Sequence, residues 1–319
     1  MNSDQLYANG RIAVLSTKLF GADKFLRLAE CSSLSEALRV LYENGYGNGV
    51  TVSNPNDYEQ VLKSELDCAM SAIKELCYDK NAVKYLLCKY DYLNAKTLMK
   101  GKYAREDYTA YCFDEGSYPK EQMQEAFVND DYSAFSKNMA KACDQIDAEY
   151  ANGNRSPQII DKLLDKASFL DMKKYAKRSS TRLIAKLFDW QVNTSNLMLL
   201  YRLKKAGYDK EQYADWLIEG ASIKKDKLLR LWDNEMVDLP EVYRKFYALC
   251  SLENATLRLA EQEQIEGRNR KIAEYQDFLT IQPSVDYFFK KVDETEKIRR
   301  VLVDVKNGVD KEKIKDKIK

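Results

Sequence analysis

Apolar residues recur along this chain at the spacing of an α-helix. Residues 160–167, 285–292 and 298–305 each carry apolar side chains at positions i, i+3, i+4 and i+7, which places them on one face of a helix. Alternation of apolar and polar residues never extends beyond a few positions. The pattern therefore predicts an all-α protein.

The two stripes nearest the C-terminus do not share one face. They are 13 residues apart, and at about 100° per residue their centres differ by roughly 140°. Either one long helix buries different faces in its two halves, or the helix breaks near Glu294-Thr295-Glu296.

Helix starts and loops are marked by a few residue types. Ser33 and Glu36 have the spacing of a capping box, and Gly/Asn-rich segments predict loops at residues 45–49 and 150–156. The chain has only 12 Gly and 5 Pro, too few for an all-β protein with a turn every ten or so residues. Each proline suits the first turn of a helix: Pro55, Pro119, Pro157, Pro240 and Pro283.

The chain repeats itself. Residues 205–211 and 306–312 share Lys, Gly, Asp, Lys and Glu at a constant offset of 101 positions. We interpret each copy as a helix end in which Gly207 or Gly308 adopts the left-handed C-cap, followed by an Asp that opens the next helix. A weaker third copy includes Asp91 and Asn94, although its glycine, Gly101, arrives four residues early. The repeat predicts three helical units, at residues 1–117, 118–221 and 222–319.

Polar residues interrupt the apolar pattern at matching places in the repeat. Polar groups inside an apolar helix need hydrogen-bond partners where elements meet. We therefore expect structural roles for them, with contact at a partner surface as the alternative. They are Asp91, Asn94, Asn193, Asn196 and Glu294.

The composition excludes several kinds of active site. Without histidine there is no Ser-His-Asp or Cys-His nucleophile, and Gly101-Lys102 is followed by Tyr103, so no phosphate-binding P-loop is present. The acidic segment 129–132 lacks the further carboxylate that diphosphate enzymes place one turn on, and predicts a turn. We expect no catalytic residue, cofactor or metal site.

Charge and cysteine content complete the picture. The net charge is +1, but residues 1–150 carry a net −6 and residues 151–319 a net +7, which suggests different partners at different faces. No basic stripe carries the interleaved aromatics of a nucleic-acid interface. Seven cysteines without a C-x-x-C pair predict reduced thiols, and Cys68, Cys77 and Cys88 are expected in the core.

Four motifs then resemble one family. The segments Tyr7–Arg11 (YANGR), Tyr90–Asn94 (YDYLN), Asp189–Asn196 (DWQVNTSN) and Tyr287–Arg299 (YFFKKVDETEKIR) resemble, in that order, the C subunit of V-type/A-type rotary ATPases. In the third copy Lys297 stands where the others have Asn, with Arg299 close behind. The resemblance spans essentially the whole chain.

The resemblance implies a function without chemistry. Family members are funnel-shaped, with three similar helical units around a pseudo-threefold axis. They lie on the cytoplasmic face of the membrane proteolipid ring and receive the tip of the central stalk, so that stalk and ring turn together during ATP-linked H⁺ or Na⁺ transport. The implied partners are the proteolipid ring and the central-stalk subunits, with no nucleic acid and no direct small-molecule ligand.

Two other functions remain open from the residues alone. A generic helical-repeat adaptor would share the same packing physics, because stacked repeats bury a continuous core. A helical enzyme acting on a diphosphate would need paired acidic clusters facing one cavity, of which only residues 129–132 are visible.

Overall fold

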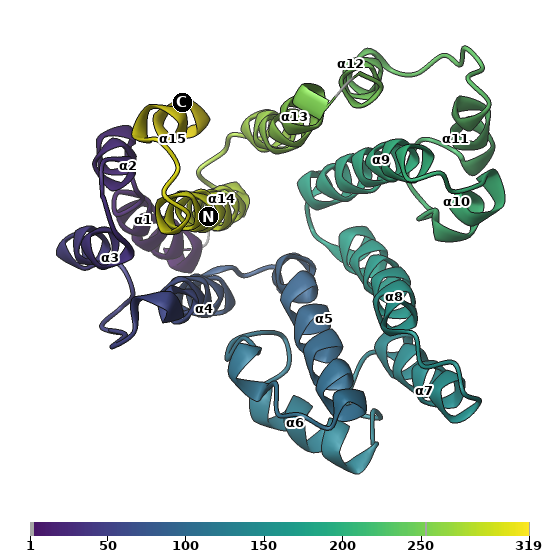
Figure 1. The fold of residues 1–319 in the computed structure, drawn as a ribbon, viewed down its shortest axis with the longest axis horizontal. Coiled ribbons are helices and arrows are strands. Elements are labelled where there is room, and N and C mark those ends of the chain that lie inside the picture. The colour runs from purple at the N-terminus through teal and green to yellow at the C-terminus, as the bar shows by residue number, and fades with distance from the viewer. Residues whose placement is uncertain (1–2, 253, 319) are drawn as a thin grey trace. The chain divides into compact units, whose positions relative to one another are not determined.

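The computed structural model describes residues 3–252 and 254–318, and every regular element in these ranges is a helix (Figure 1). The predicted all-α class is confirmed. The described chain forms two compact units: unit 1 comprises Met1–Tyr78, Phe113–Pro119 and Asp277–Lys319, and unit 2 comprises Asp79–Cys112 and Lys120–Gln276. This two-part division leaves the three predicted repeat boundaries untested.

Unit 1 is built from both ends of the chain. Its elements are α1 (Ser3–Ser16), α2 (Ala22–Ala29), α3 (Leu34–Glu43), η1 (Pro55–Asp57), α4 (Tyr58–Leu76), α14 (Gln282–Lys306) and α15 (Lys311–Ile318). Unit 2 contains α5 (Lys80–Ala104), η2 (Thr109–Tyr111), α6 (Lys120–Asn129), α7 (Lys137–Ala151), α8 (Pro157–Arg178), α9 (Arg182–Lys205), α10 (Lys210–Trp216), α11 (Lys225–Trp232), α12 (Glu241–Cys250) and α13 (Asn254–Ala273). None of the helices in the described ranges combines the length and the apolar character needed to cross a membrane.

Three long helices, α5, α9 and α14, recur at the period of the sequence repeat. They begin at residues 80, 182 and 282. Each packs against a second long helix: α5 against α8, and α9 against α13, which in both cases lies further along the chain. The partner of α14 is instead α4, which lies in the N-terminal part of the chain. The third packed pair therefore joins a helix of the C-terminal part to a helix of the N-terminal part.

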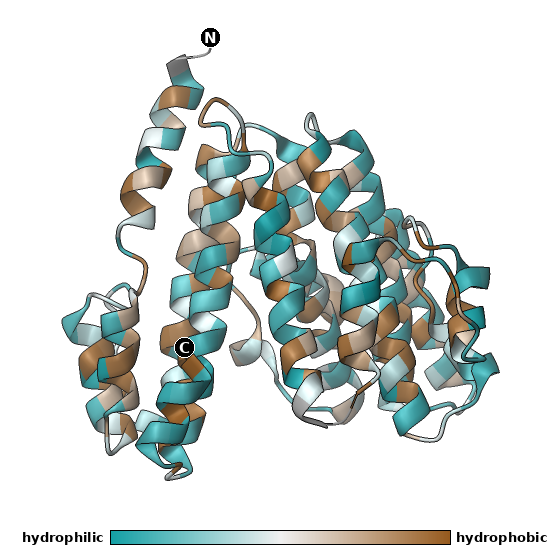
Figure 2. Ribbon diagram, turned by 90° about the horizontal axis from the view of Figure 1, so that it is seen from above, coloured by the Kyte–Doolittle hydropathy of each residue, from teal (hydrophilic) through white to brown (hydrophobic). Residues whose placement is uncertain are grey.

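Two apolar cores surround equivalent ends of α14 and α9. In unit 1, Ile298 and Leu302 of α14 pack with residues of α2, α3, α4 and α15. In unit 2, Leu197 and Leu200 of α9 pack with residues of α10, α11, α12 and α13. Figure 2 shows the corresponding pattern, with hydrophobic patches along the helices interrupted by hydrophilic ones. Burial of one face is what fixes each short helix against its long neighbour.

The long helices end in the same motif. Gly207 (φ 77°) and Gly308 (φ 66°) adopt the left-handed conformation. The next residue's N–H bonds back across the cap, from Tyr208 to Leu203 O and from Val309 to Asp304 O, each at 3.0 Å. At the equivalent end of α5, the left-handed residue is Arg105 (φ 59°). Gly101 lies one turn earlier, where a Cβ would come within 2.8 Å of Glu106 O.

Helix α14 is continuous from Gln282 to Lys306, so of the two alternatives the structure has the single long helix and no break at residues 294–296. The two apolar stripes are also less separate than their residues suggested. Lys291, Glu294 and Thr295 are buried between them and complete one inward face. These polar residues concealed the continuity of the stripe.

Several local predictions can be compared with the structure. Within residues 129–132, where the sequence predicted an N-cap or a turn, Asn129 ends α6, Asp130 forms a left-handed turn (φ 55°), and Asp131 accepts from Ser133 N. Ser33 caps α3, but Glu36 accepts from Ser32 N in place of Ser33 N. The expectation of a buried Cys68 is wrong, because this residue lies on the exposed face of α4. Its helical neighbours Glu65 and Leu66 take the inward positions.

Candidate functional site

A band of buried polar side chains crosses the middle of each long helix. We call these residues the polar bands: Asp91 and Asn94 of α5, Asn193 and Asn196 of α9, and Lys291 and Glu294 of α14. All are at least nine-tenths buried. Since an unpaired polar group is costly at such depth, the partners of each band reveal what the band does.

The α9 band holds the segment between α10 and α11 through neutral amides. Asn196 donates to Ile218 O at 2.8 Å and accepts from Ile218 N at 3.0 Å. Asn193 donates to Ser222 Oγ at 2.9 Å and accepts from Ile223 N at 3.3 Å. Each amide therefore satisfies backbone groups of a loop whose Leu217 and Ile223 lie in the core of unit 2.

The α14 band is ionic. Lys291 Nζ lies 2.8 Å from Glu65 Oε2 of α4 and 2.6 Å from Glu294 Oε1. The carboxylates also accept loop backbone, Glu294 from Phe20 N at 2.5 Å and Glu65 from Gly47 N at 2.7 Å. We call the three side chains Lys291, Glu65 and Glu294 the buried triad.

Burial and the neighbouring charges shift the pKa values of Glu294 and Lys291 in opposite directions. Burial raises the pKa of Glu294, with Lys291 and Phe20 N acting in the other direction. Burial alone would lower the pKa of Lys291, but the two adjacent carboxylates outweigh it and raise that pKa. The triad carries two carboxylates for one ammonium, which makes Lys291 the residue on which both depend.

The α5 band is the third instance. Asp91 and Asn94 are buried at 4% and 2% exposure, and both have interaction partners. Next to Asp91 in the sequence, Tyr92 donates to Asp171 Oδ2 of α8 at 2.8 Å. Asp91, Asn193 and Glu294, at offsets of 102 and 101 residues, each lie buried in the middle of a long helix.

One equivalence was not apparent from the sequence. Cys88, Trp190 and Lys291 occupy the same repeat position and each reaches its partner helix: Cys88 Sγ to Ser168 O, Trp190 Nε1 to Gln264 O, and Lys291 Nζ to Glu65. Cysteine, tryptophan and lysine share no chemistry that a search for identical residues would detect. The sequence signal for this equivalence was the position of the three residues alone, at offsets of 102 and 101.

Arg299 lies just beyond the α14 band and pairs at the surface of unit 1. Its guanidinium contacts Glu59 at 2.8 and 3.0 Å and Glu296 at 2.8 Å. Burial would lower its pKa, but Glu59 and Glu296 raise it. Gly207 and Gly308, the two remaining predicted positions, act as the caps described above.

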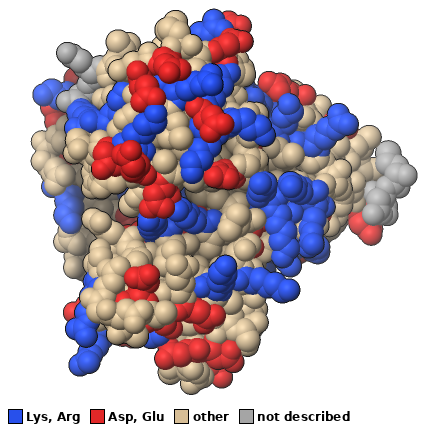
Figure 3. Space-filling model, turned by 90° about the vertical axis from the view of Figure 1, so that its right-hand side faces the viewer, with Lys and Arg blue, Asp and Glu red and all other residues tan. Residues whose placement is uncertain are grey.

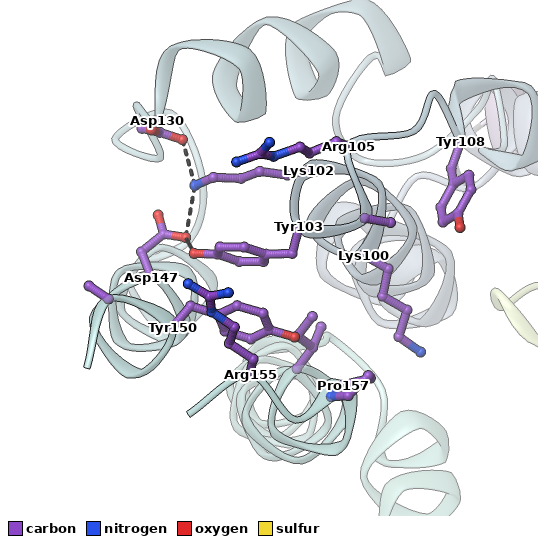
Figure 4. A pocket seen from close by; sticks show the side chains of 13 residues that line it. Lys100, Lys102, Tyr103, Arg105, Tyr108, Asp130, Asp147, Tyr150, Arg155 and Pro157 are labelled. Atoms are coloured by element: carbon purple, nitrogen blue, oxygen red, sulfur yellow. Dashed lines mark hydrogen bonds and ion pairs between the residues drawn. The ribbon is translucent and has the colours of Figure 1, made fainter. Parts of the chain in front are cut away.

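A cavity of unit 2 lies elsewhere, at the end of α5 (Figure 4). It has a volume of about 990 Å³ and is bordered by α5, α7 and the start of α8. Lys102 Nζ lies 2.6 Å from Asp130 and 2.8 Å from Asp147. Beside it the rings of Tyr103 and Tyr150 stack at 3.6 Å. In the described parts of the chain, no group of acidic or cysteine side chains is arranged to hold a metal ion.

The chain is similar to a family of ATP synthase subunits along almost its whole length. A profile described as ATP synthase (C/AC39) subunit matches residues 8–317. The C subunit of the A-type ATP synthase of Methanococcoides burtonii is 26% identical, over 99% of this chain and 94% of its own length. The proteins of the same description from Desulfurococcus and Thermococcus kodakarensis are 24% and 23% identical, each over 97% of this chain and 89% of theirs.

Proposed function

Since this chain belongs to the ATP synthase (C/AC39) subunit family, we propose that it is a non-catalytic rotor subunit that joins the central stalk to the membrane proteolipid ring. In this role it lies on the cytoplasmic face of the membrane and turns with both partners during ATP-linked transport of H⁺ or Na⁺. The observation that carries the proposal is the family match across residues 8–317.

The construction of the long helices supports a mechanical role. A coupling element has to transmit torque without yielding, and close-packed interiors transmit strain. The buried triad links α14 to α4 and fixes two loops by their backbone N–H groups. The α9 band fixes the α10–α11 loop in the same manner.

The three packed pairs support a pseudo-threefold body. Each long helix starts about 100 residues after the previous one and packs against a second long helix. We propose that the pairs surround one axis and that the stalk tip enters along it. Charged groups on the surface can fix the relative orientation of two partners at their interfaces with this chain. Figure 3 shows one face on which Lys and Arg side chains gather beside groups of Asp and Glu.

Reconstitution tests this function. Membranes that retain the ring, the stalk and the catalytic head but lack this chain should hydrolyse ATP without pumping ions. Adding back the full chain should restore ATP-driven acidification or Na⁺ uptake. Coupled pumping without the chain would contradict the proposal, as would a failure of the chain to remain with the ring and stalk in mild detergent, which a generic adaptor predicts.

Truncating the chain after Gly308 would be an ambiguous test of whether the Lys-rich end takes part in assembly. It would remove Ile314, which is 1% exposed in the core of unit 1, as well as the Lys-rich end. Lost assembly could then follow from a weakened fold. Removing the Lys317 charge, paired with Asp304 at the surface, leaves the core intact and is the cleaner change.

A further inference from the structure

The cavity at the end of α5 displays two arginines whose donors are unused. Arg105 and Arg155 line it, both are exposed, and neither has an ion pair within the described chain. Figure 4 shows their guanidinium groups directed toward the side where Lys102, Asp130 and Asp147 lie, whereas Lys100 points away. Lys100 is in turn paired with Asp161 at 2.9 Å.

The acidic groups of the cavity are already engaged. Asp147 accepts from Lys102, from the Tyr103 hydroxyl and from the Tyr132 hydroxyl, the last at 2.9 Å. Asp130 pairs with Lys102 at 2.6 Å. These carboxylates do not take up the guanidinium donors of Arg105 and Arg155, and such donors match the oxygens of a phosphate group.

The backbone supports a role for Arg105 beyond the fold. Four non-glycine residues in the described chain have positive φ, and Arg105 is the one among them that is neither Asn nor Asp. The equivalent caps of α9 and α14 use Gly207 and Gly308. An L-residue other than Asn or Asp has a steric penalty in this conformation, so arginine here is the unfavourable choice for the helix end. Strain of this kind collects where a side chain is needed.

We propose that this cavity binds a phosphate group, which Arg105 and Arg155 hold by charge-assisted hydrogen bonds. The stacked Tyr103 and Tyr150 and the Lys102–Asp147 pair form its rigid wall. No sequence motif predicts such a ligand, because the two arginines are 50 residues apart and line one cavity only through the packing of α5, α7 and α8. The site does not depend on the proposed rotary function.

The test uses the full chain and two phosphate probes. Calorimetric titration with sodium pyrophosphate, at constant ionic strength against sodium chloride, measures binding of a soluble phosphate. Sedimentation with phosphatidylcholine vesicles, with and without phosphatidic acid, measures binding of a lipid headgroup. A response to pyrophosphate assigns the site to soluble phosphorylated molecules, and a response to phosphatidic acid alone assigns it to a headgroup.

Variants separate the site from the fold. Arg105→Gly should weaken binding about tenfold or more, because it removes charge-assisted hydrogen bonds, while the melting temperature stays equal or rises as the cap gains a glycine. Arg155→Gln should weaken binding similarly. Arg182→Gln, at an exposed arginine without a described ion pair outside the cavity, should bind as the unmodified chain does.

Two results would overturn the proposal. One is the absence of any response beyond chloride to either probe. The other is unchanged affinity in both Arg105→Gly and Arg155→Gln, which would place any phosphate binding elsewhere on the chain.

Discussion

The α9 band and the α14 band share one repeat position, that of Asn193 and Glu294, and both bind loop backbone, one through neutral amides and the other through charged groups. In α9, neutral Asn193 and Asn196 hold the backbone of one loop. In α14, Glu294 and its partners in the buried triad hold the backbone of two loops, and they use full charges to do so.

The difference shows what the fold requires at these positions. It requires a polar group that satisfies buried loop backbone, because an unpaired N–H or C=O there would be costly. It does not require a charge at Asn193 or Asn196, although the carboxylate of Asp189, one turn earlier on α9, also accepts from Ser222 N of that loop at 2.6 Å. A buried ion pair gains little over a neutral arrangement, yet losing one partner leaves the other charge unpaired. We therefore expect α14 to be the more fragile of the two helices.

The largest effect should follow from Lys291→Met. The change keeps the aliphatic length but leaves Glu65 and Glu294 buried without their cation, and should cost about 3–5 kcal/mol in the free energy of unfolding. Urea denaturation followed by circular dichroism measures the loss. The matched control is Lys290→Met, since this exposed neighbour pairs with Asp286 at the surface and should change stability by about 0.5 kcal/mol or less. Equal effects of the two changes would contradict the importance of the triad.

The neutral band should respond less strongly. Asn196→Ala removes both hydrogen bonds to Ile218 and should cost about 2–3 kcal/mol, because two buried backbone groups lose their partner. Asn196→Asp sharpens the comparison, since the carboxylate can still accept from Ile218 N but cannot donate to Ile218 O. If Asn196→Asp proved as stable as the unmodified chain at neutral pH, charge would be tolerated in α9 as in α14.

A smaller effect is expected at the caps. Gly207→Ala places a Cβ on a residue at φ 77° and should cost about 1 kcal/mol. No atom lies within 4 Å of that Cβ position, so the cost comes from the backbone and not from a clash. Gly308→Ala should behave alike in thermal denaturation. Gly10→Ala provides the comparison, because Gly10 lies within α1 with an equally open Cβ position and an ordinary φ. An unchanged melting temperature in both cap variants would argue against this reasoning.

The smallest effect concerns pH. Burial raises the pKa of Glu294 above its usual value of 4.5, so this carboxyl contributes most to stability below that value and loses its contribution as pH rises through the folded pKa. In Glu294→Gln the amide oxygen can still accept from Phe20 N, while Lys291 keeps Glu65. The unfolding free energy of the unmodified chain relative to this variant should therefore fall as the pH rises above 4.5. A difference that stays constant, or rises, would show that Glu294 is not destabilised by burial.

The sequence predicted the helices well, but it predicted some of the contacts between them poorly. Regular apolar spacing located α14, but Lys291 and Thr295 look like surface residues in sequence and left open whether the helix breaks. The repeat drew attention to Glu294, whereas Glu65 had no counterpart in the repeat that would link it to residue 294. The third packed pair of long helices joins the two ends of the chain, which no local pattern reveals.

Local stereochemistry is what the sequence determined by itself: helix periodicity, the glycine caps at 207 and 308, and the positions at which polar groups enter the helices. These follow from interactions within a few residues of each other. The tertiary structure alone decided that α4 packs on α14, that one buried lysine serves two glutamates, and that Arg105 and Arg155 share a cavity. Such outcomes depend on which distant segments pack together, and burial is what makes Lys291 decisive for the stability of unit 1.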